Sequence, residues 1–364
     1  MKKVVFIITS PSAGGAETYL IRCFLEYVTD IEPTVLCKKS KYGELRERYQ
    51  KVSTLDFVGS LGLINPAPYI KLYSYLKKNH FDAICDLTGN FSAWDLLCGK
   101  LVGIEKRIAF YRESRNQFKP TIFKNLYAKL VTLITHRVST KILSNSYEAL
   151  NYFYPNWRNN SNKYIVIYNG LDISKLPNTS KGKMRTLLNI PYNAFVICHS
   201  GRYADAKNHP MIIKCAIKLC KSFPSVYFVL MGRGVREQYH EEVKAANLSA
   251  RIKFLGYRND VLSVLRSADL FYFPSLNEGQ PNALIEAMVS DLPFVASNIP
   301  SIRETIPRHL IVYLVHPESF EDNYKALESA VKDTIARQKT ICGEWARNHY
   351  DSQKSFTLFK SQLI

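Results

Sequence analysis

The chain has 364 residues, which is more than one typical domain requires and suits two domains of ordinary size. Hydrophobic residues at 46% and charged residues at 22% are typical of a globular protein with a core, and they exclude a disordered or fibrous chain. The formal net charge of +18 favours anionic partners, namely nucleotides, phospholipid surfaces or nucleic acid. A solvated basic surface with no specific partner explains the same charge.

The chain contains eight cysteines, none of which forms a C-x-x-C pair, and most lie in apolar runs such as VLC and VIC. This pattern favours buried free thiols in a reducing compartment over disulfides or zinc. The opening MKKVVFII has five consecutive apolar residues, which suits a first strand better than a signal peptide. No run reaches the roughly 18 apolar residues of a membrane-spanning helix. We therefore expect a cytoplasmic protein, or one that lies peripherally on the inner face of the cell membrane.

In the first half, short apolar segments alternate with amphipathic segments, a pattern typical of parallel strands covered by helices on both faces. Strands are predicted at 4–8, 34–37, 52–57, 82–87, 107–111 and 141–146, and helices at 16–28, 66–79, 92–102 and 119–136.

The pattern restarts after residues 169–183, a segment rich in Asn, Gly, Ser and Lys that we interpret as a linker. The fold class is therefore α/β, with two doubly wound Rossmann-like domains that face each other across a cleft. Domains are predicted at 1–170 and 171–345, followed by a C-terminal helical segment at 346–364. Strands of the second domain are predicted at 195–200, 226–231, 252–256, 270–274, 293–297 and 310–315.

The most informative segment is FYFPSLNEGQPNALIEAM (271–288), in which a strand leads through a loop into a helix. Proline is favourable at the first helical position, so Pro281 is expected to begin that helix. Gly279 lets the backbone approach a ligand, and Glu286, one turn into the helix, can accept hydrogen bonds from ribose hydroxyls, with Glu278 at the mouth. Free amides at the helix start, together with the helix dipole, form an anion site suited to a diphosphate. The amides in question are those of Asn282, Ala283 and Leu284.

The second informative segment is VICHSGRYADAKNHP (196–210), where a buried strand is followed by Gly201, Arg202 and Lys207. Two cations at the carboxyl end of a strand suit a pyrophosphate, Arg as a planar fork and Lys as a point charge. They can also stabilise the negative charge that grows on a departing nucleotide. Either cation alone is explained equally well as a solvated loop residue.

Two weaker signals lie at other turns from strand to helix. Gly232 and Gly234 follow a strand and precede a helix, which a tight turn explains as well as a ligand does. Gly14 and Gly15 lie between the first strand and the first helix, with Glu17 in the first helical turn.

Taken in order, GGAE, NGLD, GRYADAKNH, GRG, FLGYRNDV and PSLNEGQPNALIEAM resemble the retaining GT-B glycosyltransferases of the glycosyl transferases group 1 family (glycosyltransferase family 4). The resemblance extends over nearly the whole chain, and its most specific mark is the E-x7-E pair of Glu278 and Glu286. It implies that Arg202 and Lys207 hold the donor phosphates, Glu286 the ribose, and Glu278 faces the transferred sugar. It also implies that residues near Gly232–Gly234 and Tyr257–Arg258 surround the base of the nucleotide. Gly15 would approach the donor from the first domain.

The resemblance further implies transfer of a sugar from a nucleotide-sugar, UDP- or GDP-linked, to a hydroxyl acceptor with retention of configuration. The acceptor would be lipid-linked or a saccharide, as in assembly of a bacterial capsule, O-antigen or exopolysaccharide. No cofactor and no metal are expected, because the two cations and the amides at the helix start can neutralise the charge of the diphosphate. The last helix is expected to pack back on the first domain.

The sequence departs from the family at three places. Where the family often has a His at the end of the strand at 107–111, this chain has Tyr111 and Arg112, and we interpret Arg112 as a contact to phosphate or acceptor. The turn after the E-x7-E helix is Ser290–Asp291, and Asp tolerates the left-handed backbone that this turn requires. The segment 298–304 lacks the glycine pair that the family frequently has before the residue equivalent to Glu304. The identity of the transferred sugar therefore stays open.

The stretch 115–138 places Lys119, Lys124, Lys129 and Arg137 among apolar residues. A basic amphipathic helix of this kind suits an anionic membrane surface, and a core-facing helix with solvated lysines explains it equally well.

Three other functions stay open. The first is a GT-B sugar-nucleotide epimerase. The second is a nucleotide-binding oxidoreductase, which is disfavoured because no G-x-G-x-x-G follows the first strand. The third is a non-enzymatic nucleotide or nucleic-acid binder, although no nucleic-acid-binding module is visible.

Overall fold

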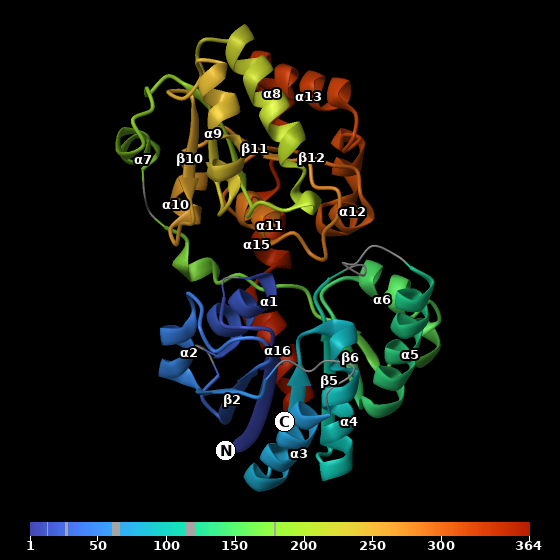
Figure 1. The fold of residues 1–364 in the computed structure, drawn as a ribbon. Coiled ribbons are helices and arrows are strands. Elements are labelled where there is room, and N and C mark those ends of the chain that lie inside the picture. The colour runs from blue at the N-terminus through green and yellow to red at the C-terminus, as the bar shows by residue number, and fades with distance from the viewer. Residues whose placement is uncertain (13, 26–27, 60–65, 114–120, 178–179) are drawn as a thin grey trace. The chain divides into compact units, whose positions relative to one another are not determined.

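A computed structural model describes residues 1–12, 14–25, 28–59, 66–113, 121–177 and 180–364 (Figure 1). The chain divides into two compact units. The first unit comprises Met1–Gly170 together with Ser352–Ile364, and the second comprises Leu171–Asp351. The division at 170 and 171 falls in the glycine- and lysine-rich segment 169–183. Each unit is a Rossmann-like α/β fold.

The first unit contains a seven-stranded parallel sheet with the order β3-β2-β1-β4-β5-β6-β7. Its strands are β1 (Lys2–Ile8), β2 (Ile31–Cys37), β3 (Thr54–Phe57), β4 (Ala83–Asp86), β5 (Lys106–Tyr111), β6 (Lys141–Ser144) and β7 (Tyr164–Val166).

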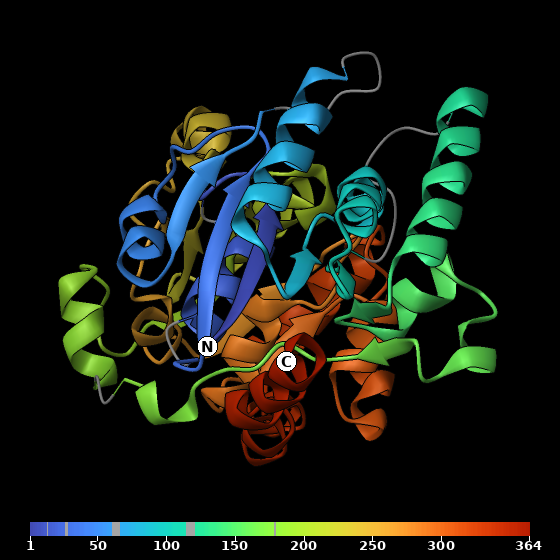
Figure 2. The same cartoon turned by 90° about the horizontal axis from the view of Figure 1, so that it is seen from below.

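Helices cover both faces of this sheet because successive apolar residues of β1 point to opposite sides. Val4 and Phe6 join one core cluster, and Val5 and Ile7 join the other. Figure 2 shows the red helix that ends at the C-terminus on one side of the sheet and the cyan helices on the other. The helices are α1 (Gly15–Thr18), the π-helix η1 (Tyr19–Leu25), α2 (Arg46–Val52), α3 (Ala67–Asn79), η2 (Gly89–Ser92), α4 (Ala93–Val102), α5 (Ile122–Val138), α6 (Tyr147–Phe153), η3 (Trp157–Asn160) and α16 (Ser352–Leu363).

The terminal helix α16 belongs to the first unit, although the chain enters it from the second. Phe356, Phe359 and Leu363 recur at helical spacing and lie in the same core cluster as Phe6. The ring of Phe359 lies 5.2 Å from that of Phe110 in an edge-to-face arrangement. This helix therefore completes one face of the first sheet.

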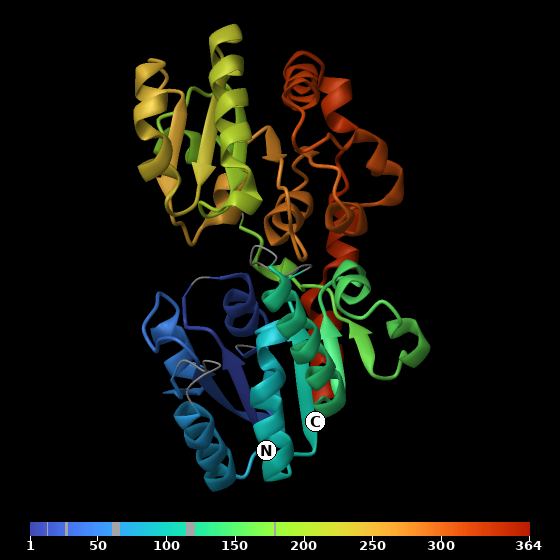
Figure 3. The same ribbon diagram turned by 45° about the vertical axis from the view of Figure 1, so that its right-hand side comes forward.

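The second unit contains a five-stranded parallel sheet with the order β10-β9-β8-β11-β12 (Figure 3). Its strands are β8 (Phe195–Ser200), β9 (Val226–Met231), β10 (Ile252–Gly256), β11 (Leu270–Phe273) and β12 (Phe294–Ala296). Its helices are η4 (Ile173–Lys175), α7 (Lys181–Leu187), η5 (Asp205–Lys207), α8 (His209–Ser222), α9 (Val235–Ala245), α10 (Val261–Leu265), α11 (Asn282–Val289), α12 (Pro300–Thr305), η6 (Arg308–Tyr313), α13 (Phe320–Lys332), α14 (Thr334–Gln338) and α15 (Gly343–His349).

The strand predicted at 310–315 is wrong. These residues form most of the 3-10 helix η6, and only one bridge, from Val315 to Ser297, joins the sheet. The Leu310 N–H donates to the carbonyl of Pro307 at 2.9 Å, which begins a helical turn instead of a ladder. Val312 is 78% exposed, so the apolar run is not the buried strand that its composition indicates.

Three further differences concern the first unit. The helix predicted at 16–28 is a short α-helix followed by the π-helix η1, and residues 26–27 lie outside the described residues. Strand β7 was not predicted. The helix predicted at 119–136 corresponds to α5, which begins at Ile122; Lys119 lies outside the described residues. Thr121 caps this helix by accepting the Lys124 N–H at 3.3 Å.

Candidate functional site

In the second unit, the strand order reverses beside β8, whose neighbours are β9 on one side and β11 on the other. Ligands of open α/β sheets bind at such switch points, outside the carboxyl ends of the strands. The loops that leave β8 and β11, residues 201–208 and 274–281, contain the two informative segments of the sequence. The topology therefore places both segments at one position of the sheet.

Backbone hydrogen bonds join the loops along this edge. The amide of Gly201 donates to Met231 at 2.8 Å, and that of Gly232 donates to Gly256 at 2.8 Å. Across the switch point, the Leu276 N–H donates to Ala206 at 2.8 Å. Gly232 has φ +147, and a Cβ there would lie 1.9 Å from the carbonyl oxygen of Gly201. Glycine is required at this position both by its conformation and by the approach of the neighbouring loop.

Lys207 and Glu278 meet across the switch point. The Lys207 Nζ lies 2.6 Å from Glu278 Oε1, and the two side chains are 22% and 10% exposed. The Lys207 ammonium also lies 5.2 Å from the centre of the Phe273 ring. The sequence assigned these residues separate roles, whereas the structure joins them as one ion pair on adjacent loops.

The start of α11 differs from the prediction in one respect. Pro281 is the N-cap residue, and the helix begins at Asn282. The carbonyl of Pro281 accepts the Leu284 N–H at 3.0 Å and the Ile285 N–H at 3.1 Å. The amide of Leu284 is therefore not a free donor, because the N-cap carbonyl already accepts its hydrogen bond. Gly279 lies in the loop before the cap.

The second turn of α11 contains Glu286, which is half-buried, eight residues after Glu278. The turn that ends the helix is as predicted, since Asp291 adopts the left-handed conformation with φ +57. Asp291 also forms an ion pair of 2.8 Å with Arg347 of α15. The end of α11 is thereby fixed.

The rim of the edge contains exposed aromatic and basic groups. Arg202 is exposed and follows Gly201 directly. The guanidinium of Arg233, in the loop after β9, lies 4.7 Å from the ring centre of Tyr257, which follows β10 and is 51% exposed. Arg258 pairs with Asp260 at 2.7 Å. A Cβ on Gly234, with φ +75, would lie 3.0 Å from Tyr203 Cβ.

Two buried histidines beneath the site were missed in the sequence. His199 Nδ1 lies 3.0 Å from the Tyr272 carbonyl, and burial lowers the pKa of His199 well below its ordinary value. Burial also lowers the pKa of His209 to about 4. Both rings are therefore neutral at neutral pH, and a Cβ on Gly201 would lie 3.0 Å from His199 Nε2. The only signal was a polar HS at the end of an apolar strand.

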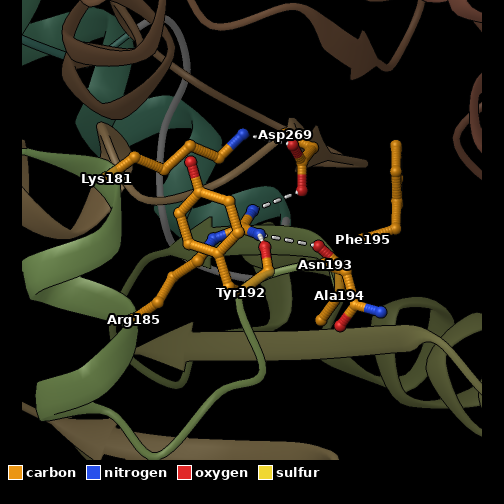
Figure 4. A pocket seen from close by; sticks show the side chains of 7 residues that line it. All are labelled: Lys181, Arg185, Tyr192, Asn193, Ala194, Phe195 and Asp269. Carbon is orange, nitrogen blue, oxygen red and sulfur yellow. Dashed lines mark hydrogen bonds and ion pairs between the residues drawn. The ribbon is translucent and has the colours of Figure 1, made fainter.

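A separate pocket of about 260 Å³ lies at the opposite, amino-terminal edge of this sheet (Figure 4). Asp269 accepts from Lys181 at 2.5 Å and from Arg185 at 2.6 Å. Arg185 also donates to the carbonyls of Tyr192 and Ala194. These contacts fix α7 against the edge of the sheet opposite the switch point.

The first unit contains the remaining predicted residues. Gly14 is the N-cap of α1 and Gly15 its first residue, and a Cβ on Gly15 would meet no atom within 4 Å. Arg112 donates to Asn169 Oδ1 at 2.6 Å, and its guanidinium lies 3.8 Å from the centre of the Tyr19 ring. These contacts hold Arg112 at the carboxyl end of β5.

A buried charge cluster in the first unit was also missed. Lys38 Nζ lies 3.0 Å from Asp86 Oδ2 and contacts Asp95 Oδ2, and it donates to Thr88 Oγ1 at 2.6 Å and to the Phe91 carbonyl at 2.8 Å. Both carboxyl groups are fully buried. A charged residue directly after an apolar strand was the only signal in the sequence.

The comparisons with known proteins agree with this architecture. The structure of Anabaena HepE in complex with UDP superposes with a TM-score of 0.82 at 19% identity, covering 100% of this chain and 99% of HepE. Sucrose-phosphate synthase from Thermosynechococcus elongatus superposes with a TM-score of 0.78 at 15% identity, covering 99% and 98%. The fold is that of the GT-B glycosyltransferases.

At the level of sequence, the chain is 26% identical over 351 residues to the capsular polysaccharide biosynthesis glycosyltransferase CapH of Staphylococcus aureus, covering 94% of this chain and 93% of CapH. It is 25% identical over 281 residues to the UDP-Gal:alpha-D-GlcNAc-diphosphoundecaprenol alpha-1,3-galactosyltransferase of Escherichia coli, covering 73% and 70%. Residues 180–348 match the family described as Glycosyl transferases group 1. The protein is thus a glycosyltransferase, and its second unit matches the glycosyl transferases group 1 family over residues 180–348.

Proposed function

We propose that this glycosyltransferase binds the diphosphate of a nucleotide-sugar at the switch point of the second sheet and transfers the sugar to a hydroxyl acceptor. The observation that carries the proposal is the Lys207–Glu278 pair across the loops of β8 and β11. A partly exposed ammonium and a carboxylate lie there on adjacent loops, where an open α/β sheet binds its ligand.

Each residue would act on a different part of the donor. Lys207 and Arg202 would bind the phosphates and stabilise the charge that develops on the leaving diphosphate. Glu286 would accept hydrogen bonds from the ribose, and Glu278 would face the sugar while holding Lys207 in position. Tyr257, which stacks with Arg233, offers a flat surface for the base.

Retention of anomeric configuration and independence of metal are part of this proposal. The retaining step rests on the resemblance of the E-x7-E segment alone. Metal independence rests on the positive charge that Lys207 and Arg202 supply, since two cations can answer the charge of a diphosphate without an ion.

The donor and the pathway are proposed from the names of the relatives. HepE was crystallised with UDP and with UDP-glucose, which supports a UDP-linked donor over a GDP-linked one. CapH is named for capsular polysaccharide biosynthesis, and the E. coli relative for a diphosphoundecaprenol acceptor. We propose a lipid-linked acceptor in assembly of a bacterial surface polysaccharide.

Turnover with a prenyl-diphosphate N-acetylglucosamine acceptor tests this function. The proposal expects release of free nucleoside diphosphate from one of a panel of UDP- and GDP-sugars, only when acceptor is present, and in excess chelator. The anomeric proton coupling of the product, measured by NMR, reports retention or inversion. Conversion of the donor without acceptor would indicate an epimerase instead, and activity that requires Mg²⁺ or Mn²⁺ would contradict metal independence.

We further propose that α5 docks on an anionic membrane on the cytoplasmic side. No helix in the described part of the chain is long and apolar enough to span a bilayer. However, α5 exposes apolar side chains, with Ile122 and Phe123 each 85% exposed and Leu126 66%. Lys129 and Arg137 lie among them, and each basic residue near an anionic leaflet contributes about 1 kcal/mol. Exposed apolar and basic groups on one helix suit an interfacial position.

Co-sedimentation with liposomes of graded phosphatidylserine content tests the docking. Binding should rise with anionic lipid, fall with added salt because the attraction is screened, and weaken in a Lys124→Gln, Lys129→Gln double variant. Lys332, exposed on α13 of the second unit, gives the control variant Lys332→Gln. Equal binding to neutral and anionic vesicles, or to neither, would contradict the proposal.

A further inference from the structure

A second cavity lies in the first unit, between α5 and the segment 152–164, and its volume is about 720 Å³. Figure 3 shows the green segment that contains α6, η3 and β7 beside α5. The lining residues are Asn90, Asn125, Ala128, Lys129, Thr132, Leu133, His136, Tyr152, Phe153, Tyr154, Pro155, Asn156, Trp157, Asn160 and Tyr164. We call this cavity the α5 groove.

The register of α5 gives the groove a polar wall. Asn125, Lys129, Thr132 and His136 recur at spacings of four, three and four, so they form one stripe of the helix. The buried residues of α5, among them Val131 and Val138, lie on another face of the helix. The stripe is therefore not required for the core.

Hydrogen bonds fix the floor of the groove. Asn90 Oδ1 accepts from Tyr111 Oη at 2.9 Å and from Thr132 Oγ1 at 3.1 Å, and the hydroxyls of Tyr111 and Tyr154 lie 2.8 Å apart. Further along, His136 Nδ1 lies 2.7 Å from the Tyr164 hydroxyl. Side chains that hold one another in this way are pre-organised for a ligand.

The opposite wall is aromatic. Trp157 is held by a stacked Tyr147 at 5.7 Å between ring centres and by a 3.0 Å hydrogen bond from its Nε1 to Asn151. Tyr152 is 45% exposed, and its ring packs edge-to-face on Phe153 at 4.9 Å. Because Trp157 is only 9% exposed and the Arg158 guanidinium lies 4.7 Å from its ring centre, the accessible ring surface of this wall comes mainly from Tyr152 and Phe153.

We infer that the α5 groove binds an oligosaccharide, as a site for a part of the glycan other than the reacting sugar. Eleven of the fifteen lining residues carry a hydrogen-bonding side-chain atom; the other four are Ala128, Leu133, Phe153 and Pro155. A hydrocarbon chain would take the exposed side chains of Asn125, Lys129, Asn156 and Asn160 out of water without forming hydrogen bonds to them, which is costly. A saccharide satisfies them with its hydroxyls and places its apolar ring faces on the aromatic wall.

The charge of the groove specifies the saccharide further. Of the described residues that line it, none is acidic, and Lys129 is the only cation, since burial lowers the pKa of His136. The groove therefore suits a neutral or acidic glycan and disfavours a cationic one. It runs along α5 on the flank of the sheet, from Asn90 after β4 to Tyr164 at the start of β7.

This inference rests on the proposed function, because a glycan substrate gives the groove its ligand. The experiment uses fluorine NMR of the full chain labelled with 5-fluorotryptophan. The chain has three tryptophans, so three resonances are expected. Trp157 lies in the groove, Trp94 lies in α4 of the same unit, and Trp345 lies in the second unit. Trp157→Phe assigns the Trp157 resonance. The probes, titrated to millimolar concentration, are cellotetraose, maltotetraose, chitotetraose and a hyaluronan tetrasaccharide, with geranyl phosphate as the hydrocarbon probe.

We expect at least one tetrasaccharide to shift the Trp157 resonance saturably, while the resonances of Trp94 and Trp345 stay in place. Tyr152→Ala and Asn156→Ala should each weaken that binding about tenfold, as loss of one good contact does. Tyr192→Ala, at a site 78% exposed in the second unit, should leave it unchanged.

The inference is overturned if none of the tetrasaccharides shifts Trp157 saturably, or if geranyl phosphate does so instead. Thermal stabilisation by UDP-glucose is measured in the same samples. A chain that binds UDP-glucose without binding tetrasaccharides contradicts the groove alone, whereas a chain that binds tetrasaccharides without any nucleotide-sugar contradicts the proposed donor site alone.

Discussion

The two sheets have equivalent switch points, and each has a lysine nearby with carboxylate partners. In the second unit, Lys207 pairs with one carboxylate, Glu278, and both side chains keep part of their surface in solvent. In the first unit, Lys38 contacts Asp86 and Asp95, which are fully buried, and two further oxygen acceptors.

The degree of burial separates the two roles. Lys38 has four acceptors around one ammonium, so an incoming ligand would have to displace a complete set of hydrogen bonds in a low-dielectric interior. Among the described residues, Lys207 forms one ion pair, with Glu278, and its side chain is 22% exposed. The carboxyl edge of the first sheet therefore contains a closed, buried charge cluster, whereas the switch point of the second sheet has a partly exposed ion pair.

The largest effect is expected from Lys38→Met. Removing the ammonium leaves two buried carboxyl groups without their cation, which typically costs about 3–5 kcal/mol. Urea unfolding of the variant should show this loss, while Lys39→Met, at the exposed neighbouring position, should change stability little. Similar stabilities of the two variants would contradict a structural role for the cluster.

Next in size are the effects of Lys207→Ala and Arg202→Ala on turnover. Each should lower kcat on the order of 10²-fold, because removal of one charge-stabilising donor has this effect. Their unfolding midpoints should stay near that of the wild type, in contrast to Lys38→Met. Arg236→Ala, an exposed cation of α9, serves as the control; near-normal turnover in either test variant would remove that residue from the site.

The two glutamates should separate binding from turnover. Glu286→Gln should weaken affinity for free UDP about tenfold, because ribose contacts exist before and during the reaction. Glu278→Gln should lower kcat more than it lowers affinity for free UDP. Isothermal titration with UDP and steady-state kinetics measure the two quantities, and the opposite pattern would invert the assignment.

The smallest effect concerns Asp95. Burial raises the pKa of Asp95 well above 3.8, although Lys38 opposes the shift. A folded-state pKa above the unfolded value means that Asp95 stabilises the fold at low pH and that this contribution is lost as pH rises. In the Asp95→Asn variant this position has no titratable group. The free energy of unfolding of the variant, compared with that of the wild type at the same pH, should therefore increase between about pH 4 and pH 7. A constant difference over this range would contradict the shifted pKa.

The sequence was sufficient to predict the elements whose signal is local. Continuous apolar runs such as 4–8 and 226–231 are buried strands, as predicted, and Asp291 adopts the left-handed turn that its position requires. The same rule failed for 310–315, where an apolar run after Pro307 forms a 3-10 helix with exposed side chains. Composition alone does not distinguish these two outcomes.

Contacts between distant segments were beyond sequence reasoning. Lys38 and Asp86 are 48 residues apart, and Lys207 and Glu278 are 71 apart, so only the strand order brings each pair together. The α5 groove likewise depends on which stripe of α5 faces the segment 152–164. The Leu284 amide was predicted to be free, but it donates to the carbonyl of Pro281, three residues earlier.

The central claim is that the switch point of the second sheet holds the donor diphosphate. Thermal stabilisation by a panel of UDP- and GDP-sugars, measured in parallel on wild type, Lys207→Ala and Lys181→Ala, tests it most directly. Lys181 is a cation of the same unit that is already paired at the opposite edge of the sheet. Each variant is compared with and without ligand, so a change in its own stability cancels. The claim predicts that one nucleotide-sugar raises Tm in wild type and Lys181→Ala but not in Lys207→Ala; equal stabilisation of all three would contradict it.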